Sequence, residues 1–579
     1  MNRRTDVDPF TLEIIKNSLV AIGDEMFVAL QRTAKSTVIY ETLDYACGLT
    51  DRSGSLISQG NGVTGFLGCL TFAVKAVLDK FQDDIHPGDL FITNDPYGGG
   101  GTHLSDVSLI QPLFSDGRLV AFAANKAHWT EVGGKDPGSW TTDATEVYQE
   151  GLQFPCVRLV ERGKIVAALV DLLAANVRTP DGTLGDMWAG IAANRVGDRR
   201  FSDLCRRYGT DTVELSIERL LHDGEVLSRA AMRNLPKGVF EAEDFIDDDG
   251  IGNGPFPVRV KVTITDDRFI CDFTGTSGQV PGPVNCGRTA LLSGARTIFK
   301  ALVGPEVPVN EGVFVPLEVI CPDGTIFTVQ RPAPVSTYWE TMAYVTDLVW
   351  KAMAPVLPDD RLTAGHFLSV CGVVVSGNHP ETGELFLLVE PQAGGWGAGR
   401  DKDGESGLVC EGDGETYVVP AEVAETRYGF LVNRYELSPE GGGDGRFRGG
   451  LGLIRDYQIT ADEAYLTATF GRFKFLPWGM DGGGLGSRNW VEIIRKDGRR
   501  EAFGKTARYR LEKGDTVRLH TATGGGFGNP LTRPVEDVLS DVLNGYITKE
   551  RAAEVYGVRI AEGNRLAGLT PERQSVYAG

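Results

Sequence analysis

The sequence lacks any closely spaced pair of cysteines. Its nine cysteines are scattered along 579 residues, and none forms a C-x-x-C motif. An odd, unclustered set of this kind is typical of reduced thiols that pack as small hydrophobic side chains in the cytoplasm. We therefore expect a cytoplasmic protein without a cysteine metal site.

Long apolar runs and an excess of basic charge are also missing. The N-terminus has no apolar signal-peptide region, and the most apolar stretches, such as 119–124 and 370–375, are far too short to cross a bilayer. Acidic residues outnumber basic ones by 78 to 58, which gives a formal net charge of −20. Because this charge repels phosphate groups, we expect neither nucleic acid nor a membrane as a partner.

The sequence has no convincing nucleotide cradle. Gly504-Lys505-Thr506 resembles the end of a P-loop, but the motif needs glycine at position 499, where this chain has Arg499. The flanking segments resemble strands, so no strand–loop–helix unit is available there. A G-x-S-x-G nucleophile elbow is absent as well.

The composition that remains is that of a globular protein, with 42% hydrophobic and 23% charged residues. The 74 glycines fall in short bursts without a three-residue period, which excludes collagen. We expect the bursts at 441–445, 449–450, 482–484 and 524–526 to be β-turns and bulges. The length suggests several units, at about 100–200 residues per domain.

The sequence pattern in the first part of the chain, up to about residue 240, predicts long helices and β-hairpins. Asp8-Pro9 is a helix start, and apolar residues follow at helical spacing, so a helix is expected over 9–34. An Asp-Gly turn at 116–117 between apolar runs predicts a hairpin. The further elements expected are a hairpin of 46–50 and 55–59, a helix over 67–81, a strand over 89–93, hairpin strands over 107–114 and 119–129, and helices over 185–206 and 213–234.

From about residue 240 the pattern changes to short strands and glycine or proline turns. Strands are expected at 257–264, 268–273, 316–320 and 325–328, helices at 287–303 and 338–354, and a helical tail at 535–543 and 549–556. This order predicts an α+β, multi-domain fold, because no regular βα repeat is present. We expect N-terminal helices with a mixed sheet over 1–240, a mixed α/β domain over 241–425, and a mostly antiparallel β domain with glycine-rich turns over 426–579.

Two of the seven histidines lie in a setting that suggests chemistry. His103 follows the four glycines at 98–101, Asp106 comes three residues later, and His128 ends the return strand of the same hairpin. Two imidazoles and a carboxylate with an open position are a common catalytic metal set. The alternative is a polar strand end whose histidines bond to backbone. For His366 and His520, which lie in strand-like runs, a satisfied core or edge histidine is the better interpretation.

The strand register decides between these interpretations. A two-residue turn leaves His103 and His128 on one face of the hairpin and turns Asp106 to the other. A three-residue turn joins Asp106 with His128 and leaves out His103. Convergence of all three therefore needs a bulge or an irregular loop end near Ser105, which the glycines at 98–101 would permit.

Motifs along nearly the whole chain resemble the hydantoinase B family. This family includes the B halves of ATP-dependent hydantoin, oxoproline and lactam hydrolases and the α-type subunits of acetone and acetophenone carboxylases. The resemblance is carried by Thr93-Asn94-Asp95-Pro96-Tyr97, Gly101-Thr102-His103-Leu104-Ser105-Asp106, His128-Trp129, Val132-Gly133-Gly134, Pro137-Gly138-Ser139, Glu150-Gly151-Leu152, Asn176-Val177-Arg178-Thr179-Pro180, Gly185-Asp186, the segment 446–452 and Gly524-Gly525-Gly526.

The resemblance implies a ligand set for a divalent metal, most simply zinc or manganese. His103, Asp106 and His128 match the ligands of the family, and Asp44 matches a further aspartate early in the chain. It also implies a partner, an A-type subunit with an actin-like ATPase fold, that uses ATP to phosphorylate the lactam or imide carbonyl. Water on this chain would then attack the activated carbon in a hetero-oligomeric complex.

Proton transfer in such a reaction needs a nearby carboxylate. Asp95, Glu131 and Glu150 are the candidates because they lie close to the site in sequence, although each is equally explained as a cap or a turn acid. Two other functions are open: an α-type subunit of an ATP-dependent ketone carboxylase, and a scaffold subunit without catalytic activity.

Overall fold

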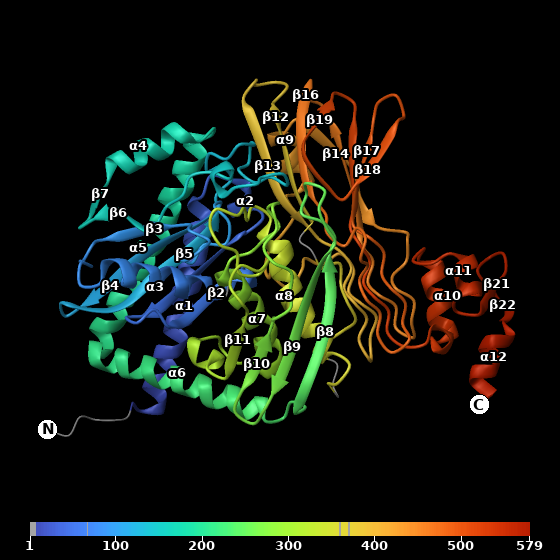
Figure 1. Cartoon of the computed structure of the whole chain (residues 1–579), viewed down its shortest axis with the longest axis horizontal. Coiled ribbons are helices and arrows are strands. Elements are labelled where there is room, and N and C mark those ends of the chain that lie inside the picture. The colour runs from blue at the N-terminus through green and yellow to red at the C-terminus, as the bar shows by residue number, and fades with distance from the viewer. Residues whose placement is uncertain (1–6, 67, 358–360, 369–370, 579) are drawn as a thin grey trace.

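A computed structural model describes residues 7–66, 68–357, 361–368 and 371–578. Figure 1 shows three regions side by side: an N-terminal sheet with its helices, a helical and β centre, and a C-terminal β region that ends in a small helical tail. The chain is thus a mixture of helices and several largely antiparallel sheets, as the element order predicts. The division at residues 240 and 425 stays a prediction.

A seven-stranded sheet with the order β2-β1-β5-β4-β3-β6-β7 forms the N-terminal region. Every neighbouring pair in it is antiparallel, so the expectation of a mixed sheet is wrong. Hairpins join β1 to β2, β4 to β5 and β6 to β7, while longer segments, one of them with a helix over 69–81, lead from β2 to β3 and from β5 to β6. No helical crossover of the kind that parallel strands need joins neighbouring strands within the described residues. Its strands are β1 (Tyr45–Asp51), β2 (Leu56–Gly62), β3 (Leu90–Thr93), β4 (Asp106–Ser115), β5 (Arg118–His128), β6 (Val157–Glu161) and β7 (Lys164–Ile165).

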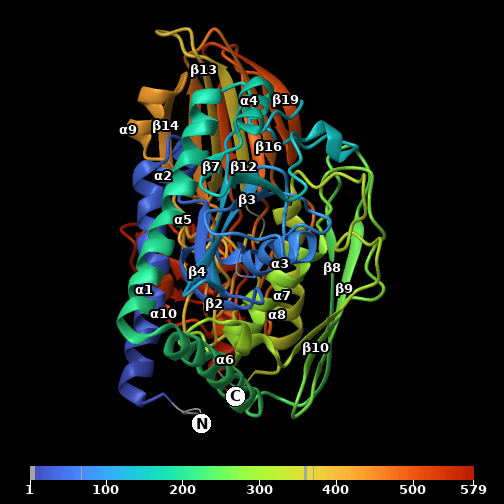
Figure 2. The same cartoon turned by 90° about the vertical axis from the view of Figure 1, so that its left-hand side faces the viewer.

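Helices cover both faces of this sheet (Figure 2). The long helices α1 (Pro9–Thr33) and α5 (Pro180–Tyr208) pack together on one face, and α3 (Cys69–Phe81) packs on the other. The side chain of Asp8 caps α1 by accepting bonds from the amides of Phe10 and Thr11, as its sequence predicts. The expected start of α3 at residue 67 lies outside the described residues. The other helices of this region are α2 (Thr37–Tyr40), α4 (Ala167–Asn176), α6 (Thr210–Met232) and the 3₁₀ turns η1 (Thr64–Phe66) and η2 (Val147–Gln149).

The centre of the molecule is a pair of helices beside a four-stranded sheet. Helices α7 (Arg288–Val303) and α8 (Tyr338–Met353) pack against each other and share a large apolar core with this sheet. The sheet has the order β11-β10-β9-β8, with only β10 and β11 parallel. Its strands are β8 (Gly238–Ile246), β9 (Phe256–Ile264), β10 (Phe269–Asp272) and β11 (Leu317–Ile320), and the 3₁₀ turn η3 (Glu311–Phe314) precedes β11.

The strand expected at 325–328 is absent from the described structure. Residues there form turns around an isolated bridge from Thr325 to Gly278. The hydroxyl of Thr325 accepts a bond from the amide of Phe327, and the hydroxyl of Thr328 donates to the carbonyl of Pro322. These local side-chain bonds compete with strand pairing, which an apolar pattern does not reveal.

Two antiparallel sheets form the β-rich region, with orders β13-β12-β16-β19 and β14-β15-β20-β17-β18. The small tail contains the helices predicted near 535 and 549 and a short hairpin. The elements are β12 (Cys371–Asn378), β13 (Leu385–Gln392), α9 (Ala421–Arg427), β14 (Phe430–Leu437), β15 (Leu453–Ile459), β16 (Glu463–Thr469), β17 (Trp490–Ile494), β18 (Arg500–Phe503), β19 (Lys505–Glu512), β20 (Thr516–His520), η4 (Pro530–Thr532), α10 (Val535–Leu543), α11 (Lys549–Glu554), β21 (Val558–Ile560), β22 (Leu566–Leu569) and α12 (Pro571–Ala578).

Most of the glycine bursts are not the turns that were expected. Four segments without regular secondary structure, 395–398, 441–452, 479–486 and 523–528, lie against one another as a glycine bundle held by backbone hydrogen bonds. A Cβ atom added to Gly524 would lie 1.9 Å from the carbonyl oxygen of Trp396, and one on Gly526 would lie 2.0 Å from that of Asp444. Glycine is therefore required for close backbone packing here, while Gly482 does lie in a turn.

All nine cysteines are free and buried, as their scattered pattern predicts. Among the described residues, no helix combines the length and the apolar character that crossing a bilayer would require.

Candidate metal centre

The hairpin of β4 and β5 brings Asp106 and His128 directly opposite each other. The turn has two residues, Asp116 and Gly117, both with positive φ, and it pairs Ser115 with Arg118. A register shift follows at once, between the pairs of Leu113 and Phe114. This bulge beside the turn sets the pairing of Asp106 with His128, and the irregular loop end predicted near Ser105 is present as well, as a turn over 103–106.

His103 reaches the same place from an irregular turn before β4. The amide of Asp106 donates to the carbonyl of His103 at 3.2 Å, so the chain folds back on itself there. His103, Asp106 and His128 each offer one ligand atom, and these atoms all lie within 4.8 Å of one another. All three residues are buried. The three residues singled out from the sequence thus form one cluster.

The hydrogen bonds around the cluster indicate the protonation states that its side chains need in order to bind a cation. Nδ1 of His103 lies 3.1 Å from the carbonyl oxygen of Ser336, which can only accept, so Nδ1 carries the proton. Nε2 of His103 then faces Oδ1 of Asp106 at 3.0 Å. The other oxygen of Asp106 accepts bonds from the hydroxyls of Thr102 and of Tyr338, the latter at 2.8 Å.

Electrostatics favour a neutral imidazole beside an ionised carboxylate. Burial, reinforced by the proximity of His103, lowers the pKa of His128 to about 3, so its ring is neutral at pH 7. Burial alone would raise the pKa of Asp106, but His103 outweighs it and holds that pKa below its ordinary value. Nδ1 of His128 is buried without a hydrogen-bond partner in the described structure, which a cation would provide.

Asp44 lies on the wall of the same cavity but outside the three-residue cluster. Its carbonyl accepts a bond from the amide of His128 at 3.0 Å. The preceding Leu43 has φ of 63°, a left-handed conformation that is strained for leucine. Burial, together with the charges of Asp106 and Asp413, raises the pKa of Asp44 well above its ordinary value.

The cavity at the cluster has a volume of about 60 Å³. Several of its walls come from parts of the chain that are remote in sequence, and sequence reasoning missed them because no local spacing connects them with His103. They include Trp140, Tyr338, Trp339, Met342, Glu390 and Asp413. The one sequence feature that could have indicated any of them is the adjacent aromatic pair, Tyr338 and Trp339, at the start of the helix predicted at 338–354.

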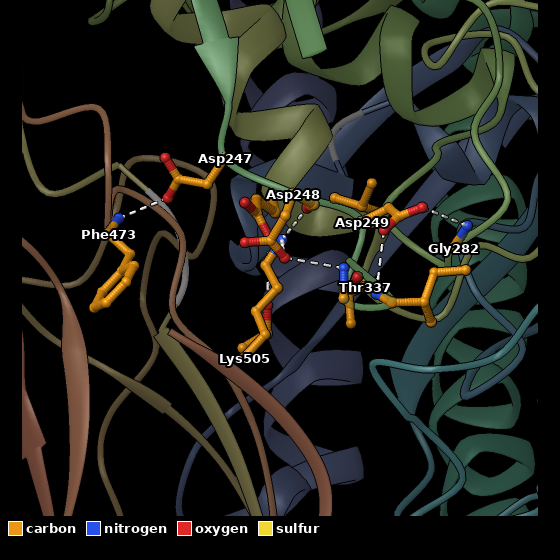
Figure 3. A network of polar contacts seen from close by, with 12 residues as sticks. Asp247, Asp248, Asp249, Gly282, Thr337, Phe473 and Lys505 are labelled. Carbon is orange, nitrogen blue, oxygen red and sulfur yellow. Dashed lines mark hydrogen bonds and ion pairs between the residues drawn. The ribbon is translucent and has the colours of Figure 1, made fainter. Parts of the chain in front are cut away.

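The first turn of α8 is held by a buried polar network (Figure 3). Nζ of Lys505 lies 2.9 Å from Oε2 of Glu340 and donates to the carbonyl of Asp248 at 2.6 Å. On either side, Asp247 accepts from the amide of Phe473 at 2.6 Å, and Asp249 accepts from that of Gly282 at 3.2 Å. The pair of Lys505 and Glu340 ties the helix end that carries Tyr338 and Trp339 to β19.

The three predicted proton carriers do not line the cavity. Asp95 pairs with Arg331 at 3.1 Å, and Glu131 accepts from Arg178 at 3.0 Å besides two backbone amides and a hydroxyl. A role for either in proton transfer stays a prediction.

Glu150 is connected to the cluster indirectly. Its Oε1 accepts bonds from the amides of Val335 and Ser336 at 2.8 and 2.7 Å. Since the carbonyl of Ser336 accepts the proton of His103, Glu150 helps to place that carbonyl. Burial raises the pKa of Glu150 to about 8, and its role in proton transfer also stays a prediction.

The fold and the cluster together define a class: an α+β chain with a buried two-histidine, one-carboxylate centre. The chain belongs to the hydantoinase B/oxoprolinase family, whose model matches residues 8–530. A putative D-/L-hydantoinase B subunit of Pseudomonas sp. (strain NS671) is 31% identical over 97% of this chain and 96% of its own length. The resemblance stated from the sequence is confirmed.

Two solved structures share the fold. The crystal structure of the ATP-dependent caprolactamase from Pseudomonas jessenii matches with a TM-score of 0.92 and 30% identity, over 99% of this chain and all of that chain. A nucleotide-free acetone carboxylase matches with a TM-score of 0.91 over 99% of this chain and 82% of its own, at 18% identity, which shows the fold alone.

Proposed function

We propose that this chain is the metal-dependent B subunit of an ATP-dependent cyclic amidohydrolase. It would open a hydantoin, oxoproline or lactam ring whose carbonyl a partner ATPase subunit has phosphorylated. Membership of the family and likeness to the caprolactamase over the whole chain support this reaction class. The observation that carries the proposal is the buried cluster of His103, Asp106 and His128.

The residues present fit a divalent cation, with zinc or manganese the best matches to histidine and carboxylate ligands. His103, Asp106 and His128 would hold it, with Asp44 as a fourth ligand from the cavity wall. A bound cation there supplies Lewis acidity, which acidifies a water molecule and attracts negative charge that develops on oxygen. The buried, unpartnered Nδ1 of His128 supports this assignment.

The surrounding residues keep the ligands in place. Tyr338 and Thr102 orient the carboxylate of Asp106, and the carbonyl of Ser336 fixes the tautomer of His103. Ligand pockets usually measure about 300–1,000 Å³. The cavity of about 60 Å³ therefore requires its walls to move before a ring can enter.

The proposal is tested with the chain co-purified with an ATPase subunit. We expect ATP-dependent opening of at least one ring in a panel of hydantoin, 5-oxoproline and lactams, measured as ADP and ring-opened product, without a need for bicarbonate. Elemental analysis should find one cation per chain in the wild type and a loss of most of it in His128→Ala. Equal cation content in both proteins would remove the ligand assignment, and full activity of His103→Ala would favour a scaffold.

A ketone carboxylase is the second candidate, because the acetone carboxylase structure has the same fold. Both reactions use ATP. A strict requirement for bicarbonate together with a ketone substrate would reverse the order of the two candidates.

A further inference from the structure

One carboxyl group on the cavity wall, that of Asp413, has no role in the cation site or in the contacts described so far. Asp413 lines the same cavity as His103, Asp106 and His128. The residue as a whole is partly exposed, but its Oδ2 atom is shielded from solvent and has no hydrogen-bond partner among the described residues. Leaving a buried carboxylate oxygen unpaired is unfavourable, so a partner supplied from the cavity would be stabilising.

The other acids of the cavity are already engaged. Glu390 pairs with Arg455 at 3.1 Å and also accepts bonds from Tyr457 and from the amide of Val419. Asp106 belongs to the cluster, and Asp44 is assigned as a fourth ligand. Asp413 is therefore the acid that is left to act on a molecule entering the cavity.

The backbone around Asp413 is fixed from two sides. Its amide donates to the carbonyl of Cys410 at 3.1 Å, and the amide of Gly65 donates to the carbonyl of Gly412 at 2.6 Å. The hydroxyl of Thr64 donates to the carbonyl of Glu411. These bonds tie the turn to the chain between β2 and α3, so Asp413 is placed before any ligand arrives.

His366 secures the same turn from the other side. Its Nε2 lies 2.6 Å from a carboxylate oxygen of Glu411, and its ring packs against those of Trp350 and Trp396, with centroid distances of 5.2 and 5.1 Å. His366 is a core histidine, as the sequence indicates, but only its Nε2 is satisfied, because Nδ1 has no hydrogen-bond partner in the described structure. A rigid turn of this kind suits a group that must meet a reacting atom.

We propose that Asp413 is the proton carrier of ring opening, an inference that rests on the proposed function. The substrate is an O-phosphorylated cyclic imidate. The oxygen of a water molecule bonds to the ring carbon as one of its O–H bonds breaks, and the π electron pair of the C=N bond moves onto the ring nitrogen. The carboxylate of Asp413 takes the proton from water and passes it to that nitrogen. The remaining hydroxyl proton follows the same route as the C–N bond breaks.

The atoms balance without a further reactant. The electron pair of the C–N bond stays on nitrogen, which leaves as an amine, and the carbonyl forms again as an acyl phosphate. A second water hydrolyses the acyl phosphate to a carboxylate and inorganic phosphate. Burial, opposed by a bond from Cys410, raises the pKa of Asp413 to about 7, which suits a group that takes and releases protons near neutral pH.

The test uses the complete complex of this chain with its ATPase subunit and a ring that the wild type opens. In Asp413→Asn we expect ring opening to fall at least about 100-fold, since general acid–base groups contribute roughly 10²–10⁴-fold. Cation content and a first burst of ADP should be unchanged. Glu415→Gln, on the exposed part of the same loop, is the matched control and should behave as the wild type.

A second variant separates chemistry from folding. Asp413→Ala should regain part of its activity when formate is added, because a small carboxylate can occupy the vacated space, and a structural role would show no such rescue. The proposal would be overturned if Asp413→Asn opened the ring at the wild-type rate, or if this variant lost the cation. Failure of the proposed function is distinguishable, because the wild-type complex itself would then open no ring.

Discussion

His103 and Ser336 are 233 residues apart in sequence, and yet Nδ1 of His103 lies 3.1 Å from the carbonyl oxygen of Ser336. This contact sets the tautomer of a predicted metal ligand by means of the segment that leads into α8. Glu150 in turn holds that segment through the amides of Val335 and Ser336. The site is therefore organised jointly by the hairpin and by the centre of the molecule.

Glu150 should make stability depend on pH. Its folded pKa of about 8 exceeds the ordinary value of 4.5, so the folded state holds a proton that the unfolded state loses between these values. The free energy of unfolding should thus fall as pH rises from 4.5 toward 8, by at most about 1.4 kcal/mol per unit from this residue. Glu150→Gln should lack this slope.

Urea denaturation of both proteins at intervals from pH 5 to pH 8 measures the difference. The glutamine oxygen can still accept both amide bonds, so a change in slope reports titration and not lost anchoring. Parallel curves for the two proteins would show that Glu150 is ionised in the folded state.

Removing the hydroxyl of Tyr338 should weaken cation binding. Tyr338→Phe deletes one of two donors to Oδ2 of Asp106 while Thr102 remains. Such partners are typically worth about 10–100-fold in metal affinity, and we expect the lower end of that range. Titration of zinc or manganese into the cation-free protein gives the affinity. Tyr344→Phe, on the same helix with a buried hydroxyl that has no partner in the described structure, is the control and should change little.

Lys505→Met should destabilise the fold strongly. It leaves the carboxylate of Glu340 buried without its partner, which typically costs about 3–5 kcal/mol. The double variant Lys505→Met/Glu340→Gln should be less destabilised than the sum of the two single variants, as measured by chemical denaturation. Lys513→Met, which breaks an exposed pair with Asp462, should cost less than about 1 kcal/mol. Additive effects at Lys505 and Glu340 would argue against a coupled pair.

A single methyl group should disrupt the glycine bundle. Gly524→Ala places a Cβ atom 1.9 Å from a backbone oxygen, so the backbone must shift, and overpacking of this kind costs about 1–3 kcal/mol or more. Gly98→Ala, which has open space around it, should change the thermal midpoint little. Equal midpoints for the two variants would show that the bundle tolerates side chains.

The sequence predicts local elements well and long-range contacts poorly. The cap at Asp8 and the Asp-Gly turn at 116–117 are local signals, and the helix and the hairpin that they predict are present. The bulge beside the turn, which brings Asp106 opposite His128, could not be located from the sequence. It adds Val120 within an apolar run, where alternation gives no register.

The same distinction holds for the site. His103, Asp106 and His128 lie within one hairpin and its approach, so their cluster could be inferred from spacing and resemblance. Tyr338 and Asp413 reach the cavity only through tertiary folding, and Asp413 sits in a glycine-flanked stretch that looks like an ordinary turn.

The glycine bundle also has a consequence for the order of folding. Its segments span residues 395 to 528, so it cannot close until nearly the whole chain has been synthesised. The N-terminal hairpins and helices, whose partners are close in sequence, can form much earlier. Because Gly372, which lines the cavity, lies in β12, and β12 pairs with β16 much further along the chain, the cavity should acquire its final shape late. A chain truncated before residue 523 would then carry an assembled N-terminal sheet beside an unfinished pocket.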